Sequence, residues 1–411
     1  MRECKTRPVK VRFVHQYFHP DLSSVSQVIS QVGFHLAAQG DEVSVICSRN
    51  KYDGAQGDRL SAREVIHGVE IRRCWGPSFG RRSLLGYFLD MVSFCVLATI
   101  RLTVAPKADT TVFLTNPPLF SLLGAVMKKI RNERFVYVLM DVYPDVTVRA
   151  GVLLEGSAIT RVLRGIARAA LKGADRVVVL GEDMRDVAVR SGAAPEKVVV
   201  IRNWADPEAI YPVPPEENRL RREWGLDGKF VVEYSGNLGV SHYFEDILAV
   251  AEELVTFDDI MFAFIGGGVR FREVEHFVVS KRLTNVILLP YQKESSLAMS
   301  LSAGDVHYIS LRPGFEGLVV PSKAYGIMAA GRPIIYQGAE NGEIARMVTR
   351  EGIGHVIPPG DREGLRDCIL SLYRNRETGS RLGAVARQVL ENKYSSAKGL
   401  SLYREVLAGE R

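Results

Sequence analysis

The feature that most constrains this 411-residue chain is its rhythm, in which short apolar, β-branched runs alternate with longer amphipathic stretches. Strand-length runs separated by helix-length stretches are typical of parallel strands joined by crossover helices. The sequence therefore predicts an α/β fold built on doubly wound sheets. The expected strands lie at 9–14, 42–47, 111–115, 135–140, 176–180 and 197–201 in the first half and at 230–235, 260–265, 285–289, 305–311 and 332–336 in the second.

A break in this rhythm near the middle of the chain indicates two domains. The length alone fits two or three domains at about 150 residues each. Residues 206–229 hold four prolines and a charged run, a composition that ends both helix and strand patterns. We expect an N-terminal domain over 1–205, a linker over 206–229 and a C-terminal domain over 230–394. Ligands of doubly wound sheets bind beyond the carboxyl ends of the strands, so functional residues should follow strands.

Composition excludes several classes of protein. With 46% hydrophobic and 24% charged residues, the chain is globular rather than disordered or fibrous. The net charge of +6 suits anionic ligands or lipid, and we expect no nucleic-acid partner. Five scattered cysteines without a CxxC pair indicate neither disulfides nor zinc, and favour a reducing compartment. Residues 1–10 lack the apolar segment of a secretory signal, so we expect a cytoplasmic protein.

Residues 84–100 form a nearly continuous apolar stretch that complicates this assignment. Arg81 and Arg82 precede it and Arg101 follows it. The stretch falls short of the roughly 20 residues that a membrane span needs. Two alternatives stay open: a helix over 84–102 that lies on an anionic membrane surface, and a helix buried in the first domain.

A second basic feature is a helix-length stretch with four cations at spacings of three, four and four. Such spacing projects all four side chains from one helix face. The stripe suits an anionic membrane or a phosphorylated acceptor, and a merely solvated face is the alternative. The four residues are Arg161, Arg164, Arg168 and Lys172.

Two glycine-rich turns follow expected strands of the second half and precede helical patterns. Glycine lets the backbone approach a ligand closely, and the free N–H groups of a helix start favour an anion. Each turn therefore predicts a phosphate site, with packing as the alternative reason for the glycines. The candidate residues are Gly236, Asn237, Gly266, Gly267, Gly268 and Arg270.

The segment 315–323 is the strongest local signal. It ends in Pro321, Ser322 and Lys323 and runs into an apolar stretch closed by a glycine. Pro321 suits the first turn of a helix, and Lys323 would stand at the positive end of that helix. A cation and a helix dipole would then meet where a diphosphate could bind.

These motifs resemble those of the retaining glycosyltransferases of family 4. The resemblance covers nearly the whole chain, and the Pro-Ser-Lys segment is its most specific part. It is similar in particular to the branch that builds bacterial surface polysaccharide and O-antigen. It implies the GT-B fold, in which two Rossmann-like domains face each other across a cleft and the last helix, here 395–411, returns to the N-terminal domain. The motifs lie at 17–21, 115–118, 141–144, 201–203, 235–237, 320–323 and 326–333.

The resemblance also implies an activity. A hexosyl or N-acetylhexosaminyl group would move from a nucleoside-diphosphate sugar, bound by the C-terminal domain, to a lipid-linked or saccharide acceptor at the N-terminal domain. The family needs no metal and no cofactor, and the chain has no Asp-x-Asp motif of the kind that holds one. We expect a peripheral protein on the inner face of the cell membrane.

The candidate site residues follow from these matches. Asp141 should end a strand of the first domain, where a carboxylate could orient an acceptor hydroxyl; capping a turn is its alternative role. For Glu343, a donor-side candidate, a place in the first turn of a helix is the alternative role. For His15 and His19, acceptor-side candidates, a structural role is the alternative. The catalytic candidates are Asp141 and Lys323; Glu316, Ser322 and Glu343 join the glycine turns on the donor side; His15, His19 and Asn203 are the acceptor-side candidates.

The sequence also departs from the family pattern. Leu318 and Gly326 stand where many members carry two glutamates, and 240–243 lack the usual Arg and Lys. Residues 23–26 replace the usual glycine pair of the first loop. Two other hypotheses therefore stay open: a non-catalytic scaffold or partner subunit of the same fold, and a sugar-nucleotide epimerase that acts on the donor alone.

Overall fold

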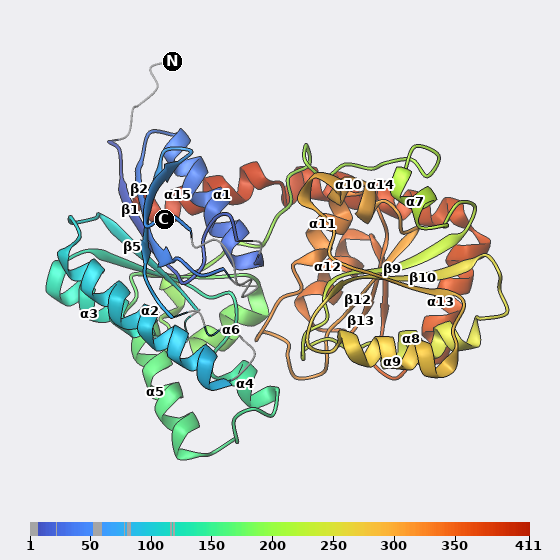
Figure 1. The fold of residues 1–411 in the computed structure, drawn as a ribbon, viewed down its shortest axis with the longest axis horizontal. Helices are drawn as coiled ribbons and strands as arrows, with labels where there is room; N and C mark the ends of the chain where they lie inside the picture. The colour runs from blue at the N-terminus through green and yellow to red at the C-terminus, as the bar shows by residue number, and fades with distance from the viewer. Residues whose placement is uncertain are drawn as a thin grey trace. The chain divides into compact units, whose positions relative to one another are not determined.

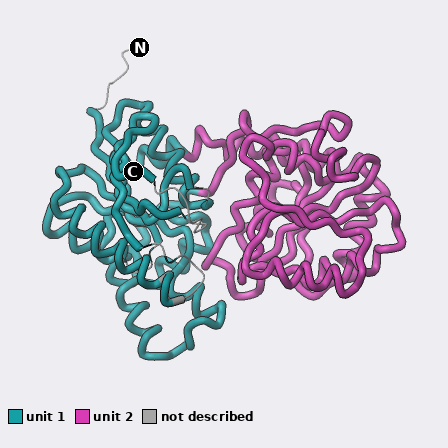
Figure 2. The backbone as a smooth tube through the Cα atoms, in the orientation of Figure 1, with its two compact units in different colours: residues 1–201, 400–411 teal, residues 202–399 magenta. Residues whose placement is uncertain are grey.

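The computed structural model describes residues 7–21, 23–51, 60–77, 79, 84–115, 117 and 120–411. The chain divides into two compact units (Figure 2). The first comprises Met1–Ile201 together with Leu400–Arg411, and the second comprises Arg202–Gly399. Each unit is a sheet covered by helices, as the sequence rhythm predicts.

The first unit contains an eight-stranded sheet in the order β3-β4-β2-β1-β5-β6-β7-β8, parallel except for β3. Figure 1 shows α2, α3 and α5 on one side of this sheet and α1 and α15 on the other. The strands are β1 (Lys10–Val14), β2 (Glu42–Ser48), β3 (Arg63–Ile66), β4 (Val69–Cys74), β5 (Thr110–Leu114), β6 (Arg134–Val138), β7 (Arg176–Val179) and β8 (Val198–Val200). The helices are α1 (Ser24–Ala38), α2 (Leu84–Val104), α3 (Ser121–Arg131), α4 (Asp145–Arg149), α5 (Ala158–Gly173), α6 (Glu182–Arg190) and α15 (Ser396–Ala408).

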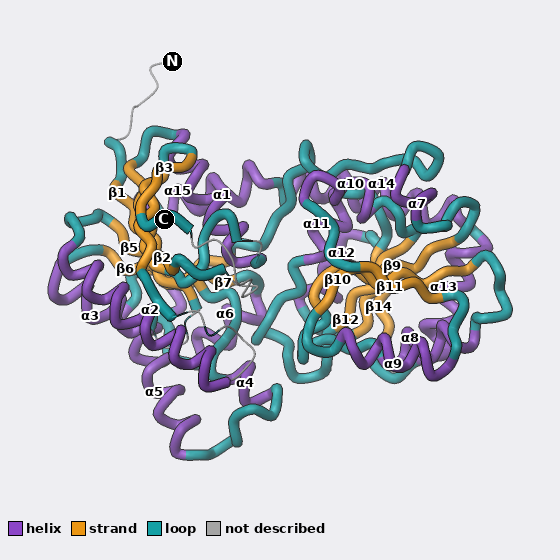
Figure 3. The backbone as a smooth tube through the Cα atoms, in the orientation of Figure 1, coloured by secondary structure: helices purple, strands orange, loops and turns teal. Residues whose placement is uncertain are grey.

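The second unit contains a six-stranded parallel sheet in the order β11-β10-β9-β12-β13-β14 (Figure 3). Its strands are β9 (Phe230–Asn237), β10 (Ile260–Gly267), β11 (Val286–Leu289), β12 (Val306–Ser310), β13 (Ile334–Gln337) and β14 (Gly354–Ile357). Its helices are α7 (Arg219–Glu223), α8 (Glu245–Glu253), α9 (Phe271–Lys281), α10 (Leu297–Leu301), α11 (Lys323–Ala329), α12 (Glu343–Glu351), α13 (Arg362–Arg374) and α14 (Arg376–Lys393).

All the strands expected from the sequence are present, with ends shifted by one or two residues. The sequence analysis missed β3, β4 and β14. β3 and β4 form an antiparallel hairpin whose two turn residues, His67 and Gly68, have φ of 47° and 82°. Such two-residue turns match the right-handed twist of the paired strands, but the search for parallel strands joined by helices does not detect them.

The expected linker is wrong, because residues 206–229 belong to the second unit. The buried guanidinium of Arg221 on α7 holds the segment there. It donates a hydrogen bond to the carbonyl oxygen of Ala303 over 2.9 Å and pairs with Asp305 at 3.1 Å. The prolines of this segment end its regular structure without detaching it from the sheet.

The boundaries between the two units also differ from the expected ones, because contacts distant in sequence decide to which unit a segment belongs. Ala205 forms a β-bridge with Ser395, which ties the chain after Ile201 to the second unit. The last helix begins in the second unit, and from Leu400 onward it belongs to the first. There Arg404 pairs with Asp41 at 3.2 Å.

Close packing of β9 on β10 predicts that Gly266→Ala destabilises the second unit. A Cβ at Gly266 would lie 2.2 Å from the carbonyl oxygen of Gly236, and its φ of +139° is unfavourable for other residues. We expect a loss of at least about 3 kcal/mol in unfolding free energy, measured by urea denaturation. Gly379→Ala on α14, where a Cβ meets nothing within 4 Å, should be neutral or stabilising by up to about 1 kcal/mol. Equal stability of the two variants would contradict this account.

Candidate functional site

The carboxyl ends of β9 and β10 bring the two glycine turns together. Gly236 pairs with Gly266, and Asn237 pairs with Gly267. A Cβ at Gly268 would lie 2.5 Å from Asn237 Oδ1, so this glycine is needed for packing. Chain order reverses between β9 and β12, which is the place where doubly wound sheets bind ligands. The structure therefore unites the residues that the sequence assigned to the two turns.

Lys323 opens α11 beside these turns. A Cβ placed on Gly236 would lie 3.7 Å from the Cε of Lys323. The Nζ donates a hydrogen bond to Tyr234 Oη over 2.6 Å and lies 3.8 Å from the centre of the Tyr234 ring. Burial lowers the pKa of Lys323 to about 7. No described residue offers it a carboxylate within 4 Å, so this cation is available to an anionic ligand.

His242 lies next to Lys323 in the turn between β9 and α8. Its Nδ1 donates to the carbonyl oxygen of Ser310 over 2.8 Å, and its ring meets that of Tyr234 edge to face. Burial lowers the pKa of His242 to about 3, and the charge of Lys323 lowers it further. At neutral pH this histidine is therefore uncharged and adds no positive charge beside Lys323.

Arg270 is already engaged by carboxylates. It pairs with Glu245 and with Glu273, each at 2.8 Å, and its guanidinium lies over the Phe244 ring at 4.2 Å. Its Nη1 also donates to the carbonyl oxygen of His242 over 2.9 Å. Arg270 therefore holds the turn around His242 in place and would need to leave these partners to reach a ligand.

The acidic candidates of the second unit differ in their surroundings. Glu343 is occupied, because it accepts hydrogen bonds from Arg202 over 2.8 Å and from Arg346 over 3.1 Å. Glu316 accepts one from the backbone N–H of Gly314 over 2.6 Å, while its Oε1 is buried without a hydrogen bond. Only the Glu316 carboxylate therefore keeps an oxygen free to accept from a ligand hydroxyl.

Two other expected positions of the second unit can now be placed. Ser322 precedes α11 and makes no capping hydrogen bond with its side chain. A Cβ at Gly326, where relatives carry a glutamate, would lie 3.2 Å from Leu301 Cδ1. The surroundings of Gly326 are therefore apolar, formed by Leu301 and Ile210.

Asp141 follows β6 at the carboxyl end of the first sheet. Its backbone N–H donates to Thr115 Oγ1 over 3.4 Å, but its carboxylate receives no hydrogen bond from any residue that the structure describes. Burial raises the pKa of Asp141 to about 6. A carboxylate that caps a turn would show the capping contact, so its surroundings favour contact with a ligand.

His15 and His19 follow β1 in the first unit. His15 is buried, its Nδ1 donates to the carbonyl oxygen of Tyr17 over 2.6 Å, and its Nε2 has no hydrogen bond. Burial lowers the pKa of His15 to about 4, so it is a neutral acceptor at physiological pH. The carbonyl oxygen of His19 accepts from Arg73 over 2.6 Å, and its ring packs on Phe34.

Asn203 lies in the second unit, two positions after the first unit ends at Ile201, and its acceptor-side role stays a prediction. Its neighbour Arg202 is paired with Glu343, which anchors this stretch beside α12. Asn203 is buried, and its Oδ1 makes no hydrogen bond.

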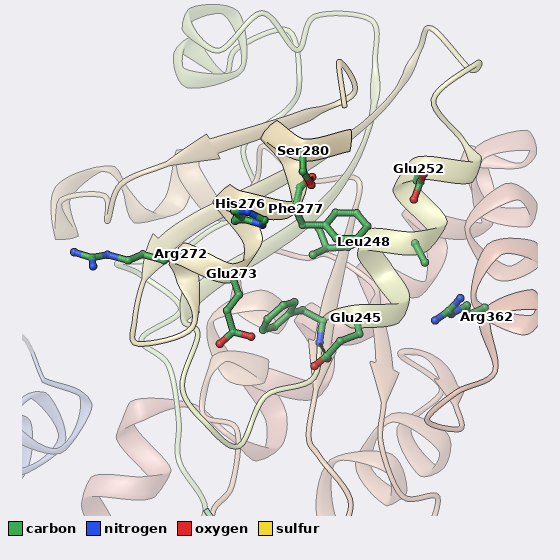
Figure 4. A pocket seen from close by; sticks show the side chains of 11 residues that line it. Glu245, Leu248, Glu252, Arg272, Glu273, His276, Phe277, Ser280 and Arg362 are labelled. Carbon is green, nitrogen blue, oxygen red and sulfur yellow. Dashed lines mark hydrogen bonds between the residues drawn. The ribbon is translucent and has the colours of Figure 1, made fainter. Parts of the chain in front are cut away.

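A surface pocket of about 770 Å³ lies between α8 and α9 (Figure 4). It is bordered by Glu245 and Glu273, which hold Arg270, and floored by Leu248 and Phe277. None of the glycine-turn residues lines it. Among the described residues, no three His, Cys, Asp or Glu side chains are grouped so as to hold a metal ion.

The apolar stretch of the first unit forms α2, which is neither fully buried nor fully exposed. Phe94, Ala98 and Leu102 are buried against the sheet. No helix in the described part of the chain has the length and apolar character to cross a membrane. The outer face of α2 remains exposed through Leu85, Phe88, Leu89, Val92, Val96, Ile100 and Val104. Arg81 and Arg82 lie outside the described residues.

The basic stripe on α5 is only partly available. Arg164 pairs with Asp145 at 2.6 Å and with Glu155 at 2.5 Å. Arg161, Arg168 and Lys172 are exposed and make no ion pair with the residues described. The stripe therefore offers three free cations rather than four.

Comparison with known proteins agrees with this architecture. Residues 25–204 match the family described as Glycosyl transferase 4-like domain. The probable glycosyltransferase WbjE of Pseudomonas aeruginosa is 32% identical over 327 residues, covering 78% of this chain and 79% of that protein. The putative colanic acid biosynthesis glycosyl transferase WcaI of Escherichia coli K12 is 26% identical over 369 residues, covering 86% and 90%.

The fold is shared with a solved structure at lower sequence identity. Anabaena HepE in complex with UDP-glucose superimposes with a TM-score of 0.74 at 15% identity, covering 98% of this chain and 100% of that one. Together with the two sequence relatives, this likeness confirms the family resemblance and the two Rossmann-like units. The chain belongs to the family 4 glycosyltransferases and is an enzyme of the GT-B fold.

Proposed function

We propose that this enzyme is a retaining, metal-independent glycosyltransferase of surface polysaccharide synthesis, with a nucleoside-diphosphate sugar as donor and a lipid-linked or saccharide acceptor. The observation that carries the proposal is the Lys323 amine, which lies beside the glycine turn after β9 and has no carboxylate partner among the residues the structure describes. The relatives WbjE and WcaI support the pathway, since WcaI is described as a colanic acid biosynthesis enzyme.

The second unit would bind the donor. Lys323 would neutralise the diphosphate as the bond between the sugar and its phosphate breaks, a role in which a fixed cation stabilises the departing charge. The free Oε1 of Glu316 could accept a hydrogen bond from a sugar hydroxyl. Arg270 would support this site indirectly by holding the turn that contains His242.

The first unit would bind the acceptor. The Asp141 carboxylate would accept a hydrogen bond from the acceptor hydroxyl and orient it toward the anomeric carbon. In front-face transfer the new C–O bond forms on the side from which the phosphate departs, and a phosphate oxygen takes the acceptor proton. No metal is required in this scheme, because Lys323 supplies the positive charge.

Ligand binding and product analysis test the proposal. A thermal-shift panel of UDP-, GDP- and dTDP-sugars should show stabilisation by one base class, since a ligand of the native state raises its stability. UDP-sugars come first because HepE was solved with UDP-glucose. Transfer should persist in excess EDTA, and NMR of the product should show the anomeric configuration of the donor. Inversion of configuration would refute the retaining mechanism, and loss of activity with EDTA would refute metal independence.

We also propose that α2 seats the enzyme on the cytoplasmic face of the membrane. Its exposed apolar side chains recur at helical spacing on one face, as in helices that lie in the membrane interface. The exposed cations Arg101, Arg161, Arg168 and Lys172 suit anionic lipid headgroups.

Flotation with vesicles that contain phosphatidylglycerol tests this surface. The double variant Leu85→Glu with Phe88→Glu should bind at least about tenfold less, because each substitution puts a charge in place of an apolar side chain that would enter the lipid. Val279→Glu, at a 75% exposed position on α9 of the second unit, should bind like the wild type. Nucleotide-sugar binding should be unchanged in both. Equal flotation of the double variant and the wild type would remove α2 from the membrane proposal.

A further inference from the structure

Tyr234 stands at the centre of the contacts around Lys323. It lies on β9, its side chain is buried, and its ring stacks on Phe264 at 27° with the centres 6.0 Å apart. The His242 ring meets its edge at 78°. The Oη donates to the carbonyl oxygen of Asn237 over 2.9 Å. Two rings and one hydrogen bond therefore fix both the plane and the hydroxyl of Tyr234.

The fixed hydroxyl is the acceptor that Lys323 uses. Since the phenol proton points to Asn237, the oxygen lone pairs are turned toward the lysine Nζ at 2.6 Å. The same Nζ lies against the ring, whose face attracts a cation. An ammonium has three N–H donors, so one hydrogen bond to Tyr234 leaves two for the oxygens of a ligand.

We propose that Tyr234 is the positioning residue of the donor site: its ring and hydroxyl hold the Lys323 amine beside the turn after β9, where the diphosphate would meet it. The inference rests on the proposed function, since it assigns the diphosphate to this turn. Because no described carboxylate pairs with the buried amine, the diphosphate is the first anion to meet it, and a proton is taken up at Nζ when the diphosphate binds.

The groups that face Lys323 are consistent with proton uptake. Tyr234 approaches from β9 and His242 from the following turn. Burial lowers the pKa of His242 and of His307 on β12, and the charge of Lys323 lowers both further. Arg270 adds a further positive charge near His242. Burial alone lowers the pKa of Lys323 to about 7. A bound diphosphate would oppose this shift, because an adjacent opposite charge favours the charged form.

Tyr234→Phe and Tyr308→Phe form a matched pair of variants. Tyr308 is also a buried tyrosine, on the neighbouring strand β12, but its hydroxyl contacts the Tyr243 carbonyl oxygen and Gln337 and not Lys323. The probes are UDP-glucose, GDP-mannose and dTDP-glucose, titrated by calorimetry from pH 6 to 9. Their diphosphates are diesters with no second ionisation near neutral pH, so the pH profile reports groups of the protein.

We expect Tyr234→Phe to weaken binding of the preferred probe about tenfold at pH 7.5 and to move the alkaline limb of the affinity profile down by about one pH unit, because the ammonium loses its acceptor. Tyr308→Phe should match the wild type within about twofold. Equal affinities and equal profiles for the two variants would overturn the inference and leave the proposed function intact. Failure of the wild type to bind any probe would overturn both.

A measurement on the wild type alone covers the case in which Tyr234→Phe does not fold. At pH 8, binding heats in buffers of different ionisation enthalpy should report uptake of nearly one proton per donor bound. Lys323→Arg, which stays charged at this pH, should take up none. A wild type that takes up no proton would overturn the inference even with tight binding.

Discussion

Lys323→Ala is expected to lower kcat/KM for the nucleotide sugar by about a thousandfold. The lysine lies beside Gly236, and no carboxylate of the described residues engages it, whereas Arg270 is paired with Glu245 and Glu273. Removal of a single hydrogen-bond donor that stabilises developing negative charge costs about 10² to 10³ in rate in a serine protease, and a full cation should be worth at least as much. Steady-state kinetics with the donor identified by the thermal-shift panel measures the loss.

The control is Lys281→Ala on α9, where the lysine pairs with Glu252 at 2.9 Å on the surface of the same unit. It should keep kcat/KM within about twofold, because an exposed ion pair contributes little. If Lys323→Ala bound the donor as tightly and turned over as fast as Lys281→Ala, Lys323 would not bind the diphosphate.

The pH dependence of kcat/KM in the wild type should also report the charge of Lys323. In the free enzyme the pKa of Lys323 lies near 7, so the charged form is lost as the pH rises through that value. We expect kcat/KM for the donor to fall above about pH 7, while kcat falls only at higher pH, because kcat/KM reports the free enzyme and kcat the bound complex. A kcat/KM profile that stays flat to pH 9 would contradict this assignment.

Asp141→Asn is the second prediction with a large expected effect, and it should change activity and stability in opposite directions. Loss of the carboxylate that orients the acceptor hydroxyl should lower kcat by about a hundredfold, with KM for the donor nearly unchanged. In the wild type, kcat/KM for the acceptor should fall below about pH 6, since protonation of Asp141 in the free enzyme removes the same carboxylate.

The stability effect follows from linkage. Burial raises the pKa of Asp141 to about 6 from its ordinary value of 3.8. A carboxyl with a higher pKa in the folded protein than in the unfolded chain opposes folding above its unfolded pKa, and this cost disappears at acid pH. We expect the asparagine variant to gain up to about 3 kcal/mol in unfolding free energy near pH 8 and almost nothing near pH 3, measured by urea denaturation.

Asp145→Asn on α4 is the matched control. That carboxylate pairs with Arg164 at 2.6 Å, so its loss should leave the protein slightly less stable and kcat unchanged. A purely structural Asp141 would behave like Asp145, with a stability loss and normal turnover.

Periodicity predicted most of the fold because buried parallel strands show nearly continuous apolar runs. It failed at β3 and β4, which form a hairpin rather than a parallel crossover unit. It also failed at 206–229, where prolines resemble a linker although Arg221 secures the segment to Asp305 of the second unit. A contact with a residue about 80 positions away leaves no trace in local sequence.

The site residues, too, were predictable only where local sequence determines their position. The glycine turns and Lys323 were predictable because each lies directly after a strand or at a helix start. Asn203 was placed in the wrong unit, because its assignment depended on the pairing of Arg202 with the distant Glu343. Tyr234 was missed altogether, since a tyrosine within a buried strand resembles any other core aromatic.

The sequence by itself determined the two doubly wound sheets, the glycine turns at their carboxyl ends and the family, because these depend on local patterns and motifs. Only the tertiary structure decided which charges are available. It paired Arg270 with Glu245, Arg164 with Asp145 and Glu343 with Arg202, each across at least 19 positions of the chain, whereas no described residue forms an ion pair with Lys323 or Asp141. The physical reason is that a side chain's charge state depends on burial and on neighbours brought together by folding, which no local pattern records.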